Sequence, residues 1–419
     1  MPDCLHHLLR YACCRVSQLS GWAMIALLIL AVNGLLPPFA SCQQLEVGRH
    51  SHSELSDKEA RTNFSGASLI LQTKDGADDI ACNVTLSLAG SVSSFDSPVP
   101  ADIYTSADFR QVCAAPGYVH VVNTINYCGG LALPGIIGCG DTPGTCIVVV
   151  RLEDPLPADK EGMLWAHEYG HTKGLDHRED ENAVMNPYLG QTERQVNATE
   201  CRAFAGRAQS STRTKSRPKP GIVDFVHRDY VEGVPYDLAS SYNREDAEKL
   251  IGLLDDQAER PYLTNIVVTL GMIGDPVAVQ PLQSFVERGE GYVDSQTLRA
   301  KTSALVALGY IVNKHNDETA LRYLAQGLNP NNWKERKLKW MLRNNDEQRN
   351  ISLIKASALG LGISGTPEAA AALNSAQFTI QSVDPSVSVT VNPVIEHALA
   401  INKTIQQKGL KRYHLEIER

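Results

Sequence analysis

The chain has 419 residues, roughly two to three times the length of an ordinary domain, so we expect more than one folded unit. Hydrophobic residues make up 43% and charged residues 21% of the sequence, as in folded globular proteins, which excludes extensive disorder. The formal net charge is -8, so the chain has no basic surplus, and we expect no nucleic-acid partner.

The first 42 residues resemble an export signal. Arg10 and Arg15 precede the apolar run WAMIALLILAVNGLL (22 to 36), which has the length of a signal-peptide core and is short for a membrane span. FASC then ends at Cys42, a pattern similar to a bacterial lipobox. We predict an exported protein, either secreted, periplasmic or an outer-surface lipoprotein of a bacterium. Lipid attachment at Cys42 and simple cleavage stay open, and an uncleaved membrane anchor is the third alternative.

Residues 43 to 65 are polar and predict a tether or a short pro-segment. Six cysteines follow within one half of the chain: Cys82, Cys113, Cys128, Cys139, Cys146 and Cys201. An even number of cysteines in an exported domain favours disulfide bonds, although the sequence does not choose among the pairings. A cysteine zinc site is the alternative, but no C-x-x-C pair supports it. The cysteine-free half after residue 201 suggests an independently built domain.

Two segments rich in β-branched residues, 118 to 127 and 145 to 153, predict strands, and GDTPG (140 to 144) between them predicts a turn. A helix is expected to begin near Asp159 and to end at Gly174. The histidine-rich stretch of the chain therefore lies on this helix and just beyond it.

The segment HEYGHTKGLDH, at 167 to 177, has the spacing of a metal site. His167 and His171 are four residues apart, so both imidazoles lie on one face of a helix and can bind one ion. Glu168 lies beside them, where it can act as a general base on a water molecule without being a ligand. Gly174 can adopt a positive φ, and the bend is expected to bring His177 to the ion as third ligand.

Two other interpretations use the same residues. The third ligand can instead be Asp176 or Glu179, since carboxylates also bind zinc. The histidines can also be ordinary polar residues at a helix end that bind no metal. A carboxylate as third ligand leaves the spacing between Gly174 and His177 without a function. If no metal is bound, the match to H-E-x-x-H-x-x-G-x-x-H is a coincidence.

Together with AVMNPY (183 to 188), the segment resembles the metzincin zinc peptidases, whose extended histidine motif is followed by a methionine turn. Met185 stands where that turn is expected. The resemblance covers residues 66 to 205 and implies an α+β metzincin-like catalytic domain, with a twisted sheet and the active-site helix in an upper subdomain. A small lower subdomain is expected after Gly174.

The resemblance also implies what the site does. It implies a Zn2+ cofactor on the three histidines, Glu168 as the general base of peptide hydrolysis, and Met185 as the apolar floor beneath the ligands. A peptide substrate is expected to pair with an edge strand, for which GGLALPG (129 to 135) is the candidate. Some relatives carry a tyrosine two residues after the methionine, but here that position is Pro187 and Tyr188 follows it.

The stretch GRAQSSTRTKSRPKPG (206 to 221) predicts a basic linker, because it is rich in serine and proline and has no apolar periodicity. From 222 to 419 the pattern is helical, and LGMIGDP (270 to 276), LGYIV (308 to 312) and LGISGTP (361 to 367) recur. Helix pairs at such intervals resemble HEAT repeats, which implies an all-α HEAT-like solenoid domain. A plain helical bundle is the alternative.

These observations favour an exported zinc endopeptidase that acts on proteins or peptides, with a helical-repeat module that binds a partner or substrate. Two other functions stay open. One is a non-catalytic adaptor that carries a structural zinc domain, although a purely structural site needs no general base. The other is a zinc amidase that acts on cell-wall peptides.

Overall fold

The computed structural model describes residues 41–75, 79–129, 132–152, 158–178, 180, 182–189, 194–206, 219–342 and 346–415. The predicted signal sequence before residue 41 lies outside this part of the chain. Cys42 lies inside a strand and is disulfide-bonded. Among the described residues, no helix combines the length and apolar character needed to cross a membrane.

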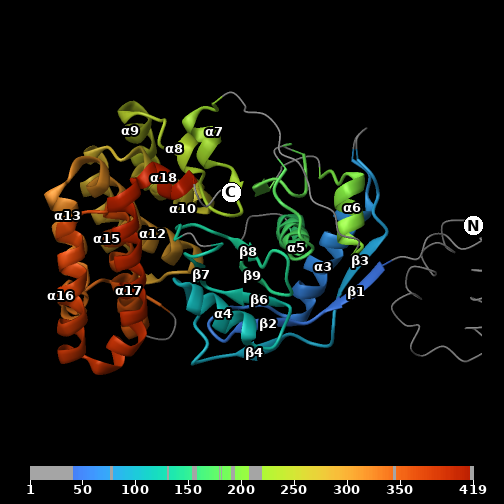
Figure 1. Ribbon diagram of the computed structural model, residues 1–419, viewed down its shortest axis with the longest axis horizontal. Helices are drawn as coiled ribbons and strands as arrows, with labels where there is room; N and C mark the ends of the chain where they lie inside the picture. Colours follow the sequence, from blue (N-terminus) through green and yellow to red (C-terminus); the bar gives the residue numbers. More distant parts are fainter. Residues whose placement is uncertain are drawn as a thin grey trace, which may run out of the picture.

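The N-terminal region is an α+β unit, drawn from blue to green in Figure 1. Its strands are β1 (Ser41–Leu45), β2 (Val47–His50), β3 (Val84–Leu88), β4 (Ser93–Phe95), β5 (Asp102–Ile103), β6 (Val119–Val122), β7 (Thr124–Ile125), β8 (Gly138–Gly140), β9 (Ile147–Val150) and β10 (Tyr188–Leu189). Its helices are α3 (Asp57–Gln72), α4 (Ser106–Ala114), α5 (Ala158–Thr172) and α6 (Ala198–Phe204). The expected strands at 118 to 127 and 145 to 153 and the expected helix before Gly174 are confirmed.

The central sheet has the strand order β4-β2-β6-β9-β8, and every pair is parallel except β8 with β9. Its middle strands are buried on both faces, as their richness in β-branched residues predicts. Val119, Val121, Ile147 and Val149 pack in one core with α3 and α5. The alternate residues of the same strands pack in a second core on the other face. The antiparallel strand β8 is left at the sheet edge, beside α5.

The structure corrects the tether predicted at 43 to 65. Strands β1 and β2 and the first half of α3 occupy this segment, and β1 pairs in parallel with β3. Helix α3 begins with a capping box between Ser56 and Glu59, and it buries Phe64 and Leu71 against the sheet. Polar residues dominate this stretch because only one face of the helix and the alternate residues of the strands are buried.

The six cysteines from Cys82 to Cys201 form three disulfide bonds with one another, so the cysteine zinc site is excluded. The pairs are Cys82–Cys201, Cys113–Cys146 and Cys128–Cys139. The first pair joins the segment before β3 to α6, and the third pair joins Cys128, just after β7, to Cys139 within β8. The edge strand β8, which borders α5, is therefore fixed by a disulfide bond.

The rest of the chain is helical, apart from short strand pairs. The helices are α7 (Ile222–Val226), α8 (Tyr236–Ala239), α9 (Arg244–Leu253), α10 (Leu263–Ile273), α11 (Val279–Glu287), α12 (Ser295–His315), α13 (Glu318–Gly327), α14 (Pro330–Glu335), α15 (Asp346–Ser364), α16 (Pro367–Val383), α17 (Pro385–Lys408) and α18 (Leu410–Leu415). The 3-10 turns Gln257–Tyr262 and Pro276–Ala278 and the strands β11 (Asp229–Tyr230), β12 (Gly291–Tyr292) and β13 (Trp340–Met341) lie between them. Helices α10, α12, α15 and α17 pack in a row in that order, with α11, α13 and α16 against them (Figure 1).

The repeated Leu-Gly pairs mark the points where neighbouring helices of this row come closest. A methyl group on any of these glycines would collide with the facing helix. The facing pairs are Gly271 with Ala307, Gly309 with Gly360, and Gly362 with Ala398. The recurring motif thus has a packing cause, because each helix of the row approaches the next through a residue that lacks a side chain.

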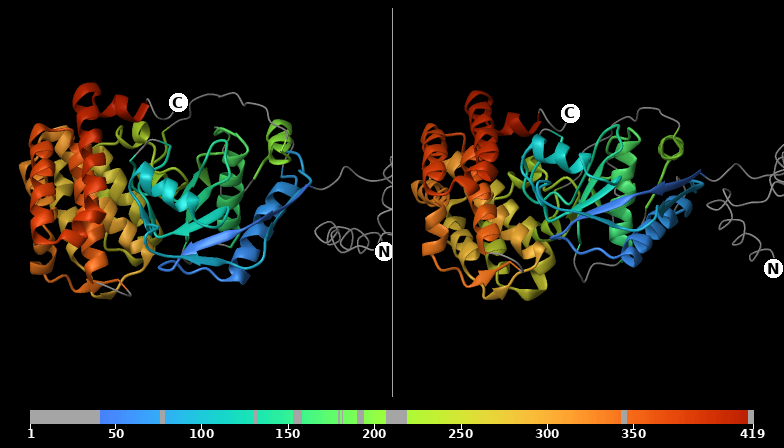
Figure 2. Two further views of the ribbon diagram at one scale, coloured as in Figure 1. Left: turned by 60° about the horizontal axis from the view of Figure 1, so that its bottom comes forward. Right: turned by 90° about the horizontal axis from the view of Figure 1, so that it is seen from below.

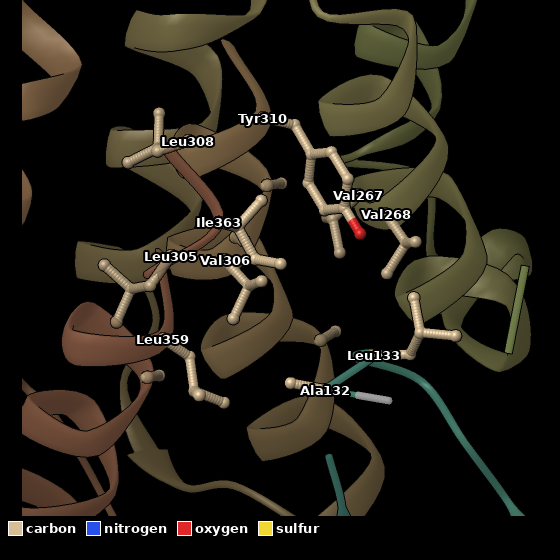
Figure 3. Packing of buried hydrophobic residues seen from close by; sticks show 14 of the residues in the cluster. Ala132, Leu133, Val267, Val268, Leu305, Val306, Leu308, Tyr310, Leu359 and Ile363 are labelled. Atoms are coloured by element: carbon tan, nitrogen blue, oxygen red, sulfur yellow. The ribbon is translucent and has the colours of Figure 1, made fainter. Parts of the chain in front are cut away.

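The helical region lies against one end of the sheet, and both views in Figure 2 agree on this arrangement. One hydrophobic core runs through both regions. Figure 3 shows Ala132 and Leu133 of the sheet region beside Val267 and Val268 of α10. The buried Arg299 of α12 also donates hydrogen bonds to carbonyl oxygens of the sheet region. The expectation of an independently built second half is therefore wrong.

Candidate functional site

Helix α5 lies in the interior of the N-terminal region, where it packs against strands β8 and β9 and against helix α3 (Figure 1). Gly162 permits this close packing, because a Cβ there would lie 2.9 Å from the backbone nitrogen of Ala67 in α3. The side chains of His167 and Glu168 are fully buried, and His171 is 5% exposed. The predicted site residues thus lie on a rigid buried element, which suits a preorganised site.

The bend after α5 has the hydrogen bonds of a Schellman motif. Gly174 has a φ of +79°, which is the left-handed conformation expected at this position. The amide of Leu175 donates to the carbonyl of Gly170 at 3.1 Å, and the amide of Gly174 donates to the carbonyl of His171 at 2.8 Å. The chain therefore turns back within two residues, which brings His177 to the other two histidines.

The three histidines converge through their Nε2 atoms. The distances are 3.0 Å between His171 and His167, 3.2 Å between His171 and His177, and 3.3 Å between His177 and His167. Three nitrogens on one tetrahedral zinc ion, with bonds of about 2.0–2.1 Å, lie about 3.3 Å apart. Asp176, the alternative ligand, is exposed and outside this cluster. Glu179 lies outside the described residues.

The protonation of His167 and His171 also fits metal binding. His167 donates from Nδ1 to the carbonyl of Val184, and His171 donates from Nδ1 to the carbonyl of Leu175, both at 2.8 Å. These bonds leave the Nε2 lone pairs directed at one common point. Burial lowers the pKa of His167 well below its usual range and the pKa of His171 to about 4, so both rings are neutral at pH 7. Neutral imidazoles are the form that binds a metal.

Met185 packs against helix α5 at Gly170, one residue before His171. Its side chain is fully buried and packs on the bare backbone of Gly170, where an added Cβ would lie 3.0 Å from the Met185 methyl carbon. The carbonyl of Met185 accepts a hydrogen bond of 2.7 Å from the amide of Arg178. The amide group of Asn186 bonds back to the carbonyl of Asp180 at 2.8 Å. The methionine turn therefore fixes the backbone that carries the third histidine.

Glu168 faces strand β8, and two glycines of that strand make room for it. A Cβ on Gly138 would lie 2.8 Å from the Glu168 carboxyl carbon, and a Cβ on Gly140 would lie 3.0 Å from Glu168 Oε2. Neither carboxylate oxygen of Glu168 accepts a hydrogen bond of good geometry from a described residue, and the backbone amide of Gly140 is the donor that faces it. Burial, and secondly the charge of Glu232, raises the pKa of Glu168 well above its usual range. Buried carboxylates without a hydrogen bond of good geometry are rare outside functional sites.

Glu232 is a site residue that sequence reasoning missed. It follows β11, beyond the predicted linker, yet Glu232 Oε1 lies 3.7 Å from His171 Nε2. Glu232 Oε2 lies 3.6 Å from His177 Nδ1, and the side chain is 40% exposed. The sequence motif gives no signal for this residue, because it is 55 positions after His177 and was assigned to the helical domain.

Two details of the expected cleft differ from the structure. The edge strand is β8, a few residues beyond the predicted 129 to 135, of which 130 and 131 lie outside the described residues. Tyr188 forms strand β10 with Leu189, and its ring stacks near the guanidinium of Arg228, whose central carbon is 4.9 Å from the ring centre.

A second group of possible ligands, His50, His52 and Asp96, does not fit a metal. The amide of His52 donates to His50 Nδ1 at 3.1 Å, and His50 Nε2 lies 3.2 Å from the carbonyl of Val99, to which it donates. Both ring nitrogens of His50 are therefore used within the protein. Among the described residues, the triad of His167, His171 and His177 is the remaining candidate metal site.

Comparison with known proteins agrees with this geometry. The family model for matrixin matches residues 160–201, a stretch that runs from α5 through the methionine turn to α6. No curated protein matches the chain. The match covers a small part of the sequence, but it contains every predicted ligand, the general base and Met185. It supports a metzincin-like domain around α5 and a metallopeptidase-type hydrolase.

Proposed function

We propose that the protein is a zinc-dependent endopeptidase that hydrolyses peptide bonds of protein substrates. One observation carries the proposal: the imidazoles of His167, His171 and His177 converge on one point, and the buried carboxylate of Glu168 lies on the same helix, next to His167. A structural site has no use for such a carboxylate, which favours catalysis over the adaptor alternative.

Glu168 is the proposed general base. Its carboxylate takes a proton from the attacking water and later returns it to the leaving amine. When bound, Zn2+ supplies Lewis-acid activation of the water and of the scissile carbonyl. The histidines hold the ion, with the orientations of His167 and His171 fixed by the carbonyls of Val184 and Leu175. Gly138 and Gly140 of β8 leave the space that the Glu168 side chain occupies. A side chain at either position would collide with Glu168.

We further propose that the helical region is a HEAT-like module that binds a protein partner or substrate. Its two layers of packed helices support this reading. Two apolar side chains on its outer helices are largely exposed, Phe378 at 77% and Val389 at 78%. Export remains part of the proposal for the full chain, without the lipid on Cys42, because the sulfur of this residue is in a disulfide bond.

Glu168→Gln tests the assignment. The variant keeps the side-chain shape and should retain zinc, but it should lose about 10²- to 10⁴-fold in peptide turnover, the usual contribution of a general base. Glu245→Gln makes the same change on an exposed face of α9 and is the control. Turnover near that of the parent chain would reject Glu168 as the base. Peptide hydrolysis that survives chelation would reject the zinc peptidase.

A further inference from the structure

Helices α16 and α17 form a hairpin at one end of the helix row. Asp384 is both the C-cap of α16 and the N-cap of α17, so one residue joins the two helices. Helix α17 packs on α15 and α16, and it is the last helix of the row α10, α12, α15 and α17. The hairpin therefore lies at the end of the molecule away from the sheet (Figure 1 and Figure 2). Its exposed residues between 369 and 395 are here called the hairpin surface.

The hairpin surface carries almost no charge. From 369 to 395, Asp384 is the single charged residue, whereas 27 residues at the chain's charged fraction of 21% would hold about six. The carboxylate of Asp384 caps α17, where it accepts from the amide of Val387 at 3.3 Å and from the hydroxyl of Ser386 at 2.6 Å. End units of helical-repeat proteins need a polar outer face for solubility. Depletion of charge is instead typical of the core of a protein interface.

Three apolar side chains project from the hairpin surface. Phe378 is 77%, Val383 is 43% and Val389 is 78% exposed. Phe378 lies two positions from the buried Ala376 and Ile380, and therefore on the side of α16 that faces away from the core. Val389 lies between two buried valines of α17 in the same way. Large apolar groups without neighbouring charges mark a surface that another molecule covers.

The lack of charge limits what can cover this surface. Helices that lie on a membrane carry lysine and arginine on their polar face, and residues 369 to 395 contain neither. Two different proteins are matched by opposite charges across their interface, which this surface does not offer. When two copies of one chain meet on a two-fold axis, residues near the axis meet their own copies, so any charge there faces a like charge. An uncharged surface is free of this repulsion and therefore suits a second copy.

The size of the hairpin surface agrees with a weak dimer. Helix α16 has 17 residues, which gives a length of about 25 Å. Two neighbouring helices, each about 10 Å in diameter, present a width of about 20 Å. Each copy therefore covers about 500 Å², and the total of about 1,000 Å² reaches the lower limit of specific protein interfaces.

We propose that the hairpin surface is the interface of a homodimer, in which Phe378 and Val389 pack against a second copy of this chain. The proposal rests on the partner-binding role proposed for the helical region, for which it names the partner. It does not depend on the peptidase function. Because the hairpin lies at the end of the molecule away from the sheet, the dimer is elongated, with its two histidine triads on opposite sides of the interface.

Sedimentation velocity of the purified chain over about 1–100 µM tests the proposal, because small interfaces associate weakly. The parent chain should change from monomer to dimer within this range. The double variant Phe378→Glu/Val389→Glu should stay monomeric, because it places carboxylates where the two copies meet. Leu69→Glu is the matched control, since Leu69 is 65% exposed on α3, and it should dimerise like the parent. Small-angle X-ray scattering of the dimer should give a maximum dimension roughly twice that of the monomer.

The outcomes separate this proposal from the proposed functions. A parent chain that stays monomeric over the whole range would overturn the homodimer. A dimer that persists in the double variant would place the interface elsewhere and overturn it as well. A monomeric parent chain that binds a different protein through Phe378 would overturn the homodimer and support partner binding by the helical region. Dimerisation without peptide hydrolysis would support the interface and reject the peptidase. Circular dichroism of each variant confirms that the fold is retained.

Discussion

The strand that borders the general base offers a sharp test of the site. Gly138→Ala adds one methyl group to β8, which would lie 2.8 Å from the carboxyl carbon of Glu168 and 2.8 Å from a methyl carbon of Leu164. Two carbon atoms pack without strain at about 3.5–4.0 Å, so the carboxylate must shift by about 1 Å. The end of the Glu168 side chain can make this shift, and the metal ligands are untouched.

A displacement of about 1 Å in a catalytic group costs on the order of 10²-fold in rate, which corresponds to about 2.7 kcal/mol. We therefore expect Gly138→Ala to lower kcat/KM about 100-fold while zinc content and the melting temperature stay close to those of the parent. The measurement uses a fluorescent peptide substrate, with metal analysis of the same samples.

Gly252→Ala is the control, because a Cβ at this position in α9 meets no atom within 4 Å. It should leave kcat/KM unchanged. If Gly138→Ala retains the kcat/KM of its parent, Glu168 does not need the space that β8 provides, and its assigned position is wrong. If the variant loses zinc as well, the strand supports the ligands rather than the base.

Three further predictions concern the metal, the helix row and a disulfide. His177→Ala should lose most of its zinc on dialysis, and unchanged metal content would point to a carboxylate as third ligand. Gly309→Ala places a Cβ 2.8 Å from Gly360 Cα and should lower the free energy of unfolding by about 1–3 kcal/mol; equal stability in urea would contradict the close crossing. Replacing Cys113 and Cys146 by serine opens a bridge with a sequence separation of 33, which should cost about 3–4 kcal/mol; calorimetry that shows no drop in melting temperature would argue against it.

The local part of the site could be predicted from the sequence, because it depends on short-range spacing. The i, i+4 pair His167 and His171, the bend at Gly174 and the position of Met185 are set within about two dozen residues. Each follows from helix periodicity or from the positive φ of glycine. The strands at 118 to 127 and 145 to 153 were predictable for the same reason, since buried parallel strands leave unbroken β-branched runs.

The long-range part could not be predicted. Glu232 reaches the triad only because Val231 pairs with β8 and Asp229 with Lys160, and sequence separation hides such pairings. The polar stretch at 43 to 65 predicts a tether because half of each element faces solvent. The Leu-Gly repeats indicated helices, but their role as crossing points depends on which helices become neighbours.

The hydrophobic core that runs from the sheet into the helix row has a thermodynamic consequence. When two halves of a chain share buried apolar surface, unfolding one half alone costs much free energy. The apolar face of the other half would then be exposed to water. The protein should therefore melt in one cooperative transition rather than two. Loss of packing deep in α15 then lowers the population of chains that hold a metal, although no atom of that helix touches a ligand.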